Sequence, residues 1–224
     1  MIKAGPARLA LIVIYITLLC GGGGRAAVPG IDPAPYDRVV DCVRWKSQDG
    51  RGLDFCILGY EGEERGRTLA VYEVGPRGAR RIFLDQERGF NPWKIMVAEL
   101  DGDTLPEIAV GAYKAARFDP TLDNRLLIFD WTLSDTLFAK WLGSRLGLPY
   151  LDFAFARGPD GIDRLLSIEH AGQERLVLRQ YHWNGFGFSH DRDWRRISNP
   201  ENFEISASKL KREMEELERK GVTP

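Results

Sequence analysis

The stretch that decides the fold is NPWKIMVAELDGDTLPEIAVG, residues 91–111. Two apolar segments flank an acidic turn: residues 94–100 end in a leucine, and residues 107–110 restart as a strand. Short apolar runs bounded by turn residues are typical of β-strands, and the Asp/Gly segment between the runs is typical of a turn. We therefore expect two strands joined by an acidic turn.

The acidic turn carries oxygen ligands at regular spacing. Glu99, Asp101, Asp103 and Glu107 occupy relative positions one, three, five and nine, and Leu105 at position seven could offer its backbone carbonyl. A hard cation such as Ca²⁺ requires several oxygen ligands around one point. The spacing therefore predicts a calcium site at these five residues. The alternative is a solvated acidic turn without a metal, because Asp and Gly are also ordinary turn residues.

The string ELDGDTLPEIAVG resembles the core of an FG-GAP/VCBS repeat, the blade unit of integrin-like β-propellers. The usual pattern of that family is D-x-D-G-D-G-x-x-D followed by a strand. Glu99 stands at the position of its first Asp, Glu107 at that of its last Asp, and Thr104 at that of its second Gly. The resemblance covers one blade, and it implies a propeller fold with Ca²⁺ as the bound ion.

A unit of four β-rich runs occurs three times along the chain. Each unit spans roughly 50 residues, which is the size of one propeller blade. The sequence therefore predicts an all-β fold of about three four-stranded, propeller-like blades. The expected strands are residues 38–45, 53–60, 68–74 and 79–84, then 92–100, 107–113, 125–131 and 136–142, then 150–156, 164–170, 175–183 and 186–194.

Three blades are fewer than closed propellers typically have. Either a fourth blade is disguised, or the sheets form a partial or open propeller, or a second copy of the chain completes the ring as a homo-oligomer. The tail predicts a helix over residues 206–220, with Leu210, Met214 and Leu217 at helical spacing and Gly221 at its end. That apolar stripe could pack on the sheets or dock a partner.

The N-terminal segment is typical of a secretory signal peptide. Lys3 and Arg8 precede an apolar run over residues 9–19, and small residues follow up to a cleavage point after Ala26. The run is short for a membrane span. An uncleaved anchor and lipoprotein processing at Cys20 are the alternatives. We expect a signal peptide over 1–26, a linker over 27–36, a repeat domain over 37–198 and a helical tail over 199–224 in a secreted, periplasmic or cell-surface protein.

Export changes the interpretation of the two remaining cysteines. Cys42 and Cys56 lie in two expected neighbouring strands joined by a short turn. An even number of cysteines in an oxidising compartment predicts a disulfide. The alternative is a pair of buried free thiols.

The charge balance bears on the class of partner. The chain has 31 Lys and Arg residues against 32 Asp and Glu residues, and it has no basic run with interleaved aromatics. Nucleic-acid-binding proteins normally show a basic face, so we expect no nucleic-acid partner. The three histidines (His170, His182 and His190) accompany no nucleophile or metal-ligand motif, and we assign no catalytic residue.

Aromatic and basic residues gather on the loops that follow the second and fourth strands of the units. Such loops lie at one end of the blades, where loop aromatics favour recognition. We therefore expect an exported, non-enzymatic binding or scaffold protein with a protein or carbohydrate partner. The alternative is a carbohydrate-active hydrolase or lyase that stacks sugars on Trp93 or Tyr150, although aromatics that begin strands also pack between blades. The expected ligand-binding residues are Arg88, Asn91, Trp93, Tyr113, Lys114 and Tyr150.

Overall fold

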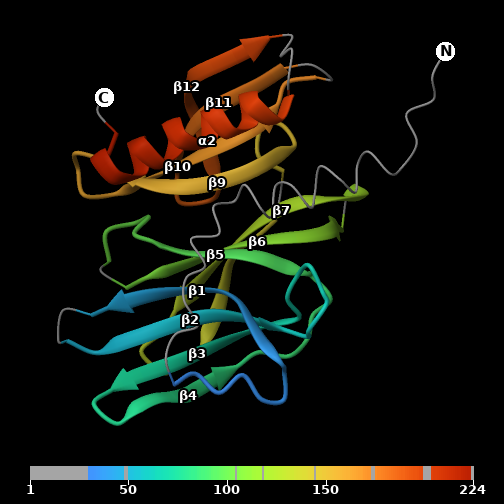
Figure 1. Ribbon diagram of the computed structural model, residues 1–224. Coiled ribbons are helices and arrows are strands. Elements are labelled where there is room, and N and C mark those ends of the chain that lie inside the picture. Colours follow the sequence, from blue (N-terminus) through green and yellow to red (C-terminus); the bar gives the residue numbers. More distant parts are fainter. Residues whose placement is uncertain are drawn as a thin grey trace.

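Twelve strands and one C-terminal helix make up the described part of the chain in the computed structural model. The structure describes residues 30–47, 50–103, 105–117, 119–143, 145–172, 175–198 and 203–222. The strands form three antiparallel four-stranded sheets, each built from four consecutive strands, and the sheets are stacked in layers (Figure 1). The expected all-β fold is confirmed. The expected signal peptide and Cys20 lie outside the described residues.

Each of the twelve strands expected from the sequence is present, with small shifts of the ends. The first sheet contains β1 (Arg38–Lys46), β2 (Gly52–Gly59), β3 (Thr68–Gly75) and β4 (Gly78–Leu84). The second contains β5 (Pro92–Ala98), β6 (Glu107–Ala116), β7 (Asp119–Trp131) and β8 (Leu137–Leu142). The third contains β9 (Tyr150–Arg157), β10 (Asp163–His170), β11 (Arg175–Trp183) and β12 (Phe188–Ser198).

The largest difference from expectation is the start of β7. The Asp-Pro pair at residues 119–120 is typical of a turn, yet β7 begins at Asp119 and pairs it with Ala116 of β6. The buried Arg125 donates to Asp119 Oδ2 at 2.8 Å and to the carbonyl of Thr121 at 2.9 Å. These bonds along β7 hold the polar segment against β6 as an extension of the hairpin.

The first core layer lies between the first and second sheets. Alternate residues of β2, such as Phe55 and Ile57, pack against Ile108 and Val110 of β6 and against Phe129 of β7. The edge strands β1 and β5 of these two sheets are also in contact, and the amide of Ile95 donates to Asp41 Oδ2 at 2.9 Å. Burial of apolar side chains from both faces supplies the main driving force that holds these two sheets together.

The second core layer lies between the second and third sheets. Trp93 packs edge-on against Phe153, with ring centroids 5.9 Å apart, and both rings cover Gly111 of β6. A Cβ atom at Gly111 would lie 2.8 Å from Trp93 Cζ2 and 2.9 Å from Phe153 Cε1. The glycine is therefore needed for the close approach of the two sheets.

Helix α2 (Phe203–Lys220) covers the outer face of the third sheet (Figure 1). Leu210 and Met214 are buried and Leu217 packs beside them, which confirms that the stripe packs on the sheet. The helix begins three residues before the expected start. Gly221 follows it with φ of 77°, a conformation suited to a helix C-terminus.

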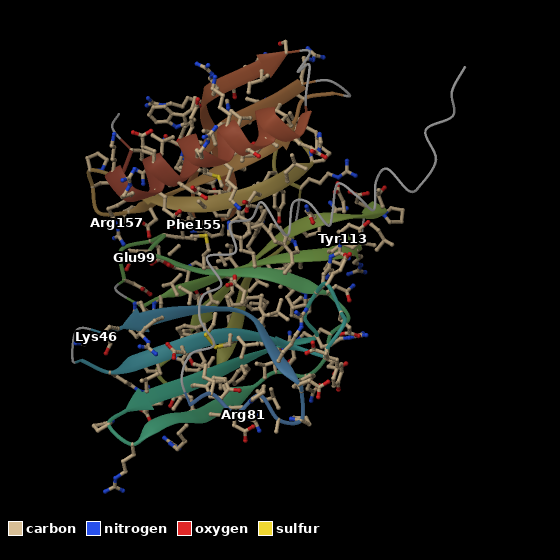
Figure 2. All side chains as sticks on the ribbon, in the orientation of Figure 1. Lys46, Arg81, Glu99, Tyr113, Phe155 and Arg157 are labelled. Atoms are coloured by element: carbon tan, nitrogen blue, oxygen red, sulfur yellow. A yellow bond between two sulfur atoms is a disulfide. The ribbon has the colours of Figure 1, made fainter. Side chains whose placement is uncertain are left out.

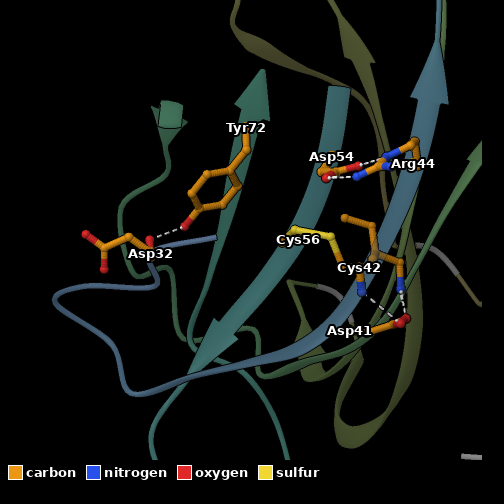
Figure 3. Close-up of a disulfide and its surroundings, with 8 residues drawn as sticks. Asp32, Asp41, Cys42, Arg44, Asp54, Cys56 and Tyr72 are labelled. Atoms are coloured by element: carbon orange, nitrogen blue, oxygen red, sulfur yellow. Dashed lines mark hydrogen bonds and ion pairs between the residues drawn. A yellow bond between two sulfur atoms is a disulfide. The ribbon is translucent and has the colours of Figure 1, made fainter. Parts of the chain in front are cut away.

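The segment before β1 covers the outer face of the first sheet. Tyr72 of β3 donates its hydroxyl to the carbonyl of Asp32 at 2.8 Å (Figure 3). Tyr36 and Ile31 pack in the same apolar cluster. Both outer faces of the stack are therefore covered by the chain's own terminal segments. Among the described residues the sheets form an open stack, with no fourth sheet.

A disulfide crosslinks the first two strands, as predicted. Cys42 and Cys56 are directly paired in the β1–β2 register, and their Cα atoms lie 4.1 Å apart (Figure 3). Fourteen positions separate the two cysteines in sequence. In the chain-entropy model, closing a loop of this size stabilises the fold by about 3 kcal/mol.

Candidate functional site

The acidic turn between β5 and β6 brings together three of the five residues predicted to bind calcium. One carboxylate oxygen each from Glu99, Asp101 and Glu107 lies within 4.8 Å of the others. Asp103 is outside this group, and its Oδ1 instead accepts the amide of Leu105 at 2.8 Å. The carbonyl of Leu105 stays a predicted ligand. Calcium at this turn stays a prediction.

Lys140 from β8 reaches into the same turn. Its ammonium nitrogen lies 2.6 Å from Asp101 Oδ2, 2.5 Å from Glu107 Oε1 and 2.9 Å from Asp130 Oδ1. The lysine side chain is only 15% exposed. An ammonium group has three N–H donors, so these three carboxylates satisfy all of them.

Backbone amides of the turn donate hydrogen bonds to further carboxylate oxygens. Leu100 donates to Glu107 Oε2 at 2.8 Å, and Gly102 donates to Glu99 Oε1 at 2.8 Å. Gly102 has φ of 84°, a conformation that disfavours other residue types. The turn is therefore held by its own carboxylates, which accept from the backbone as well as from Lys140.

Burial and charge act in opposite directions on the central pair. Burial raises the pKa of Glu107 to about 7, against the lowering effect of its bonds to Lys140 and the Leu100 amide. Burial lowers the pKa of Lys140, but the bonds to Asp101, Glu107 and Asp130 outweigh the effect of burial and raise the pKa of Lys140 well above its ordinary value. Lys140 is therefore cationic, and its charge keeps the pKa of Glu107 from rising further above its ordinary value.

Near the corresponding turns of the other two sheets, a buried carboxylate of the second strand also pairs with a basic side chain, here one on the first strand directly opposite. Asp54 of β2 accepts two bonds from Arg44, at 2.7 and 2.8 Å. Asp163 of β10 lies 2.8 Å from Arg157 and also accepts the amide of Glu99 at 2.8 Å. This last bond joins the third sheet to the acidic turn of the second.

A cleft of about 950 Å³ opens beside the acidic turn. We use "the cleft" for the volume bounded by this turn, β8, the β9–β10 turn, the β11–β12 hairpin and the end of α2. Its basic side chains are Lys140, Arg164 and Arg192, and its acidic ones are Asp101, Asp160 and Asp191. Gln180, His182, Trp183 and His190 also line it.

The charged groups of the cleft are engaged with one another or with neighbouring polar groups. Asp160 Oδ2 accepts from Arg164 at 2.5 Å, and Asp191 accepts from Gln180 at 3.0 Å and pairs with His182 Nδ1. The guanidinium carbon of Arg192 lies 5.3 Å from the ring centroid of Trp194. The lining therefore carries basic and acidic side chains in equal number, three of each.

The residues predicted to bind a ligand lie at the opposite end of the stack from the acidic turn (Figure 2, compare Tyr113 with Glu99). Asn91 donates to the carbonyl of Tyr113 at 3.1 Å, and Lys114 follows in the same strand. Arg88 bonds to Asp85 at 2.8 Å.

Two of these predicted residues pack between sheets. Tyr150 is 3% exposed, and its ring lies 6.5 Å from that of Trp93. Burial raises the pKa of Tyr150 well above its ordinary value. Neither ring stands out as an exposed platform, which agrees with the packing alternative for aromatics that begin strands.

Sequence reasoning missed Lys140 and the cleft. Lys140 lies 33 positions after Glu107, and nothing in the local sequence of β8 marks it as a partner of the turn. The β11–β12 hairpin, with its WNGFGF turn and the flanking His182 and His190, was the available signal for the cleft, because aromatics on an exposed hairpin favour recognition. Phe186 at its tip is 89% exposed.

No protein-family model and no curated protein sequence matches this chain. Within the part of the chain that the structure describes, no helix has the length and apolar character needed to cross a membrane.

Proposed function

We propose that the chain is an exported, non-enzymatic binding or scaffold protein of FG-GAP/VCBS-type repeats, which binds its partner in the cleft. The observation that carries this proposal is the cleft of about 950 Å³, which is lined by three basic side chains, three acidic side chains and the ring of Trp183. Ligand sites are concave and combine apolar or aromatic surface with a few fixed polar groups. The disulfide between Cys42 and Cys56 supports export, because such bonds persist in oxidising compartments.

The chemistry of the lining favours a neutral polar ligand, and we propose a carbohydrate. Three basic and three acidic side chains line the cleft, so it carries no excess positive charge to attract a phosphate or a nucleic acid. Trp183 offers an aromatic ring, while Gln180, His182 and Arg192 offer hydrogen-bonding groups at fixed positions. A flat ring beside such groups matches the apolar face and hydroxyl rim of a sugar.

A glycan array with the purified protein tests this proposal, followed by calorimetry on any glycan that binds. We expect Trp183→Ala and Arg192→Ala each to weaken binding at least ~10-fold, since a lost good contact costs on the order of 1.4 kcal/mol. Phe138→Ala is the matched control, because Phe138 is 68% exposed on β8 and does not line the cleft. Binding that is unchanged in both cleft variants, or lost only in Tyr113→Ala, would contradict the cleft as the site.

The second candidate is a carbohydrate-active hydrolase or lyase, and the pairing of His182 with Asp191 in the cleft favours it. A carboxylate on one ring nitrogen orients the other nitrogen of the histidine, which is an arrangement used by general bases. Turnover of a polysaccharide that disappears in Asp191→Asn would support this alternative. Binding without turnover across a panel of polysaccharides would favour the non-enzymatic role.

A further inference from the structure

We infer that Lys140 supplies the positive charge of the acidic turn, so that this chain folds without calcium at the position where FG-GAP/VCBS-like repeats carry the ion. The ammonium nitrogen of Lys140 lies within 2.9 Å of three carboxylates, those of Asp101, Glu107 and Asp130. Two of these three belong to the predicted calcium ligands. The lysine therefore occupies the place that the ligand spacing assigns to a cation.

The contacts leave few oxygens for an ion. Calcium takes six to eight oxygen ligands at about 2.3–2.6 Å. Glu107 is 1% exposed and bonds to Lys140 through one oxygen and to the Leu100 amide through the other. Glu99 Oε1 and Asp101 Oδ1 accept the amides of Gly102 and Asp103. An ion would have to displace the largely buried ammonium group of Lys140, which has the same sign of charge and already bonds to Asp101 Oδ2 and Glu107 Oε1.

In the other two sheets a basic side chain also pairs with a buried carboxylate. Arg44 pairs with the fully buried Asp54 near the start of β2, and Arg157 pairs with Asp163 at the start of β10. Each second strand of a sheet therefore begins near a buried carboxylate that a basic side chain of the same sheet neutralises. In these two sheets the basic residue lies directly opposite the carboxylate on the first strand, whereas Lys140 comes from the fourth strand of its sheet. The recurrence is therefore independent of the geometry at Lys140, and it indicates that an ion pair neutralises the buried carboxylate near each of the three turns.

The inference predicts a specific response to calcium and to substitution. The unfolding temperature of the wild-type protein is expected to be equal in millimolar CaCl₂ and in EDTA, because an ion that does not bind the native state cannot stabilise it. Lys140→Met is expected to unfold about 5–15 °C lower, because it leaves a buried carboxylate without its partner. Lys114→Met, at the opposite end of β6, is the matched control and is expected to leave the unfolding temperature within ~2 °C.

Thermal unfolding of these proteins with and without calcium is the test. A rise in unfolding temperature that calcium produces only in Lys140→Met would support the inference further, since it would show that the carboxylates accept an ion once the lysine is removed. A wild-type protein that calcium stabilises by several degrees, with the effect lost in Asp101→Asn, would overturn it. An unchanged unfolding temperature of Lys140→Met would also overturn it.

Terbium luminescence on the folded wild-type protein covers the case in which Lys140→Met does not fold. Terbium(III) binds calcium sites and emits when a nearby tryptophan is excited, and the ring of Trp183 lies 5.9 Å from the Lys140 ammonium. We expect wild-type emission no stronger than that of Asp101→Asn. Saturable emission that calcium displaces and that Asp101→Asn lacks would overturn the inference.

Discussion

The cover that α2 provides over the third sheet can be tested by shortening one buried side chain. Leu210 is 0% exposed and packs in the apolar cluster between the helix and the sheet. Leu210→Ala removes its buried methyl groups and leaves a cavity, which costs about 2–5 kcal/mol in well-packed cores. For a protein of this size, each kcal/mol lowers the unfolding temperature by about 2–4 °C. A loss of about 3 kcal/mol would therefore lower it by about 6–12 °C.

Urea unfolding followed by tryptophan fluorescence measures the loss in the free energy of unfolding. Lys209→Ala is the matched control, because it is the neighbouring residue on the same helix and its side chain is exposed. Exposed substitutions of this kind change stability by about 0.5 kcal/mol or less. A Leu210→Ala protein with the wild-type urea midpoint would refute the conclusion that α2 is a structural part of the stack.

Two further predictions concern crosslinks within the fold. Replacing both Cys42 and Cys56 by serine is expected to lower the free energy of unfolding by about 3 kcal/mol. Reduction of the wild-type protein should have a similar effect in urea unfolding. Equal stability of the oxidised and reduced proteins would contradict this prediction. Burial raises the pKa of Asp152, but Lys94 and Lys211 outweigh that effect and lower it, so the folded protein holds its proton less tightly than the unfolded chain. The resulting stabilisation is complete above the unfolded pKa of about 3.9 and is lost as the pH falls through the lower folded pKa. The loss of stability in acid should therefore be shallower in Asp152→Asn than in wild type. Equal urea midpoints for the two proteins at every pH would contradict this.

Local patterns of the sequence predicted most of the fold. Each strand of a meander pairs with its neighbour along the chain, so alternation and turn residues suffice to locate the strands. The Cys42–Cys56 bond followed for the same reason, because adjacent hairpin strands place the two residues opposite each other. The apolar spacing of Leu210 and Met214 likewise predicted a helix with one buried face.

The features that sequence reasoning missed depend on contacts between distant segments. Lys140 meets Glu107 only because the β6–β7 and β7–β8 registers bring the three strand ends together. Tyr150 was assigned to a recognition surface because it begins a strand, yet the approach of the third sheet to the second buries its ring. The start of β7 at Asp119 depends on the buried Arg125, whose partners lie four and six residues earlier along the chain.

The covering of both outer faces also followed from three-dimensional packing. The sequence left open whether three blades need a second copy of the chain to complete them. In the structure, Tyr36 and its neighbours lie on one outer face, and Leu210 and Met214 lie on the other. Because the chain covers both outer faces, the apolar faces of the sheets are buried within one chain, so association is not required to bury them.

The central claim is therefore that this open stack of three sheets is a self-contained unit. Light scattering coupled to size-exclusion chromatography of the purified protein tests this claim most directly. We predict the mass of a single chain, no more than the 25.3 kDa of the full sequence, at all concentrations examined. A mass of two or more chains that persists on dilution would contradict it.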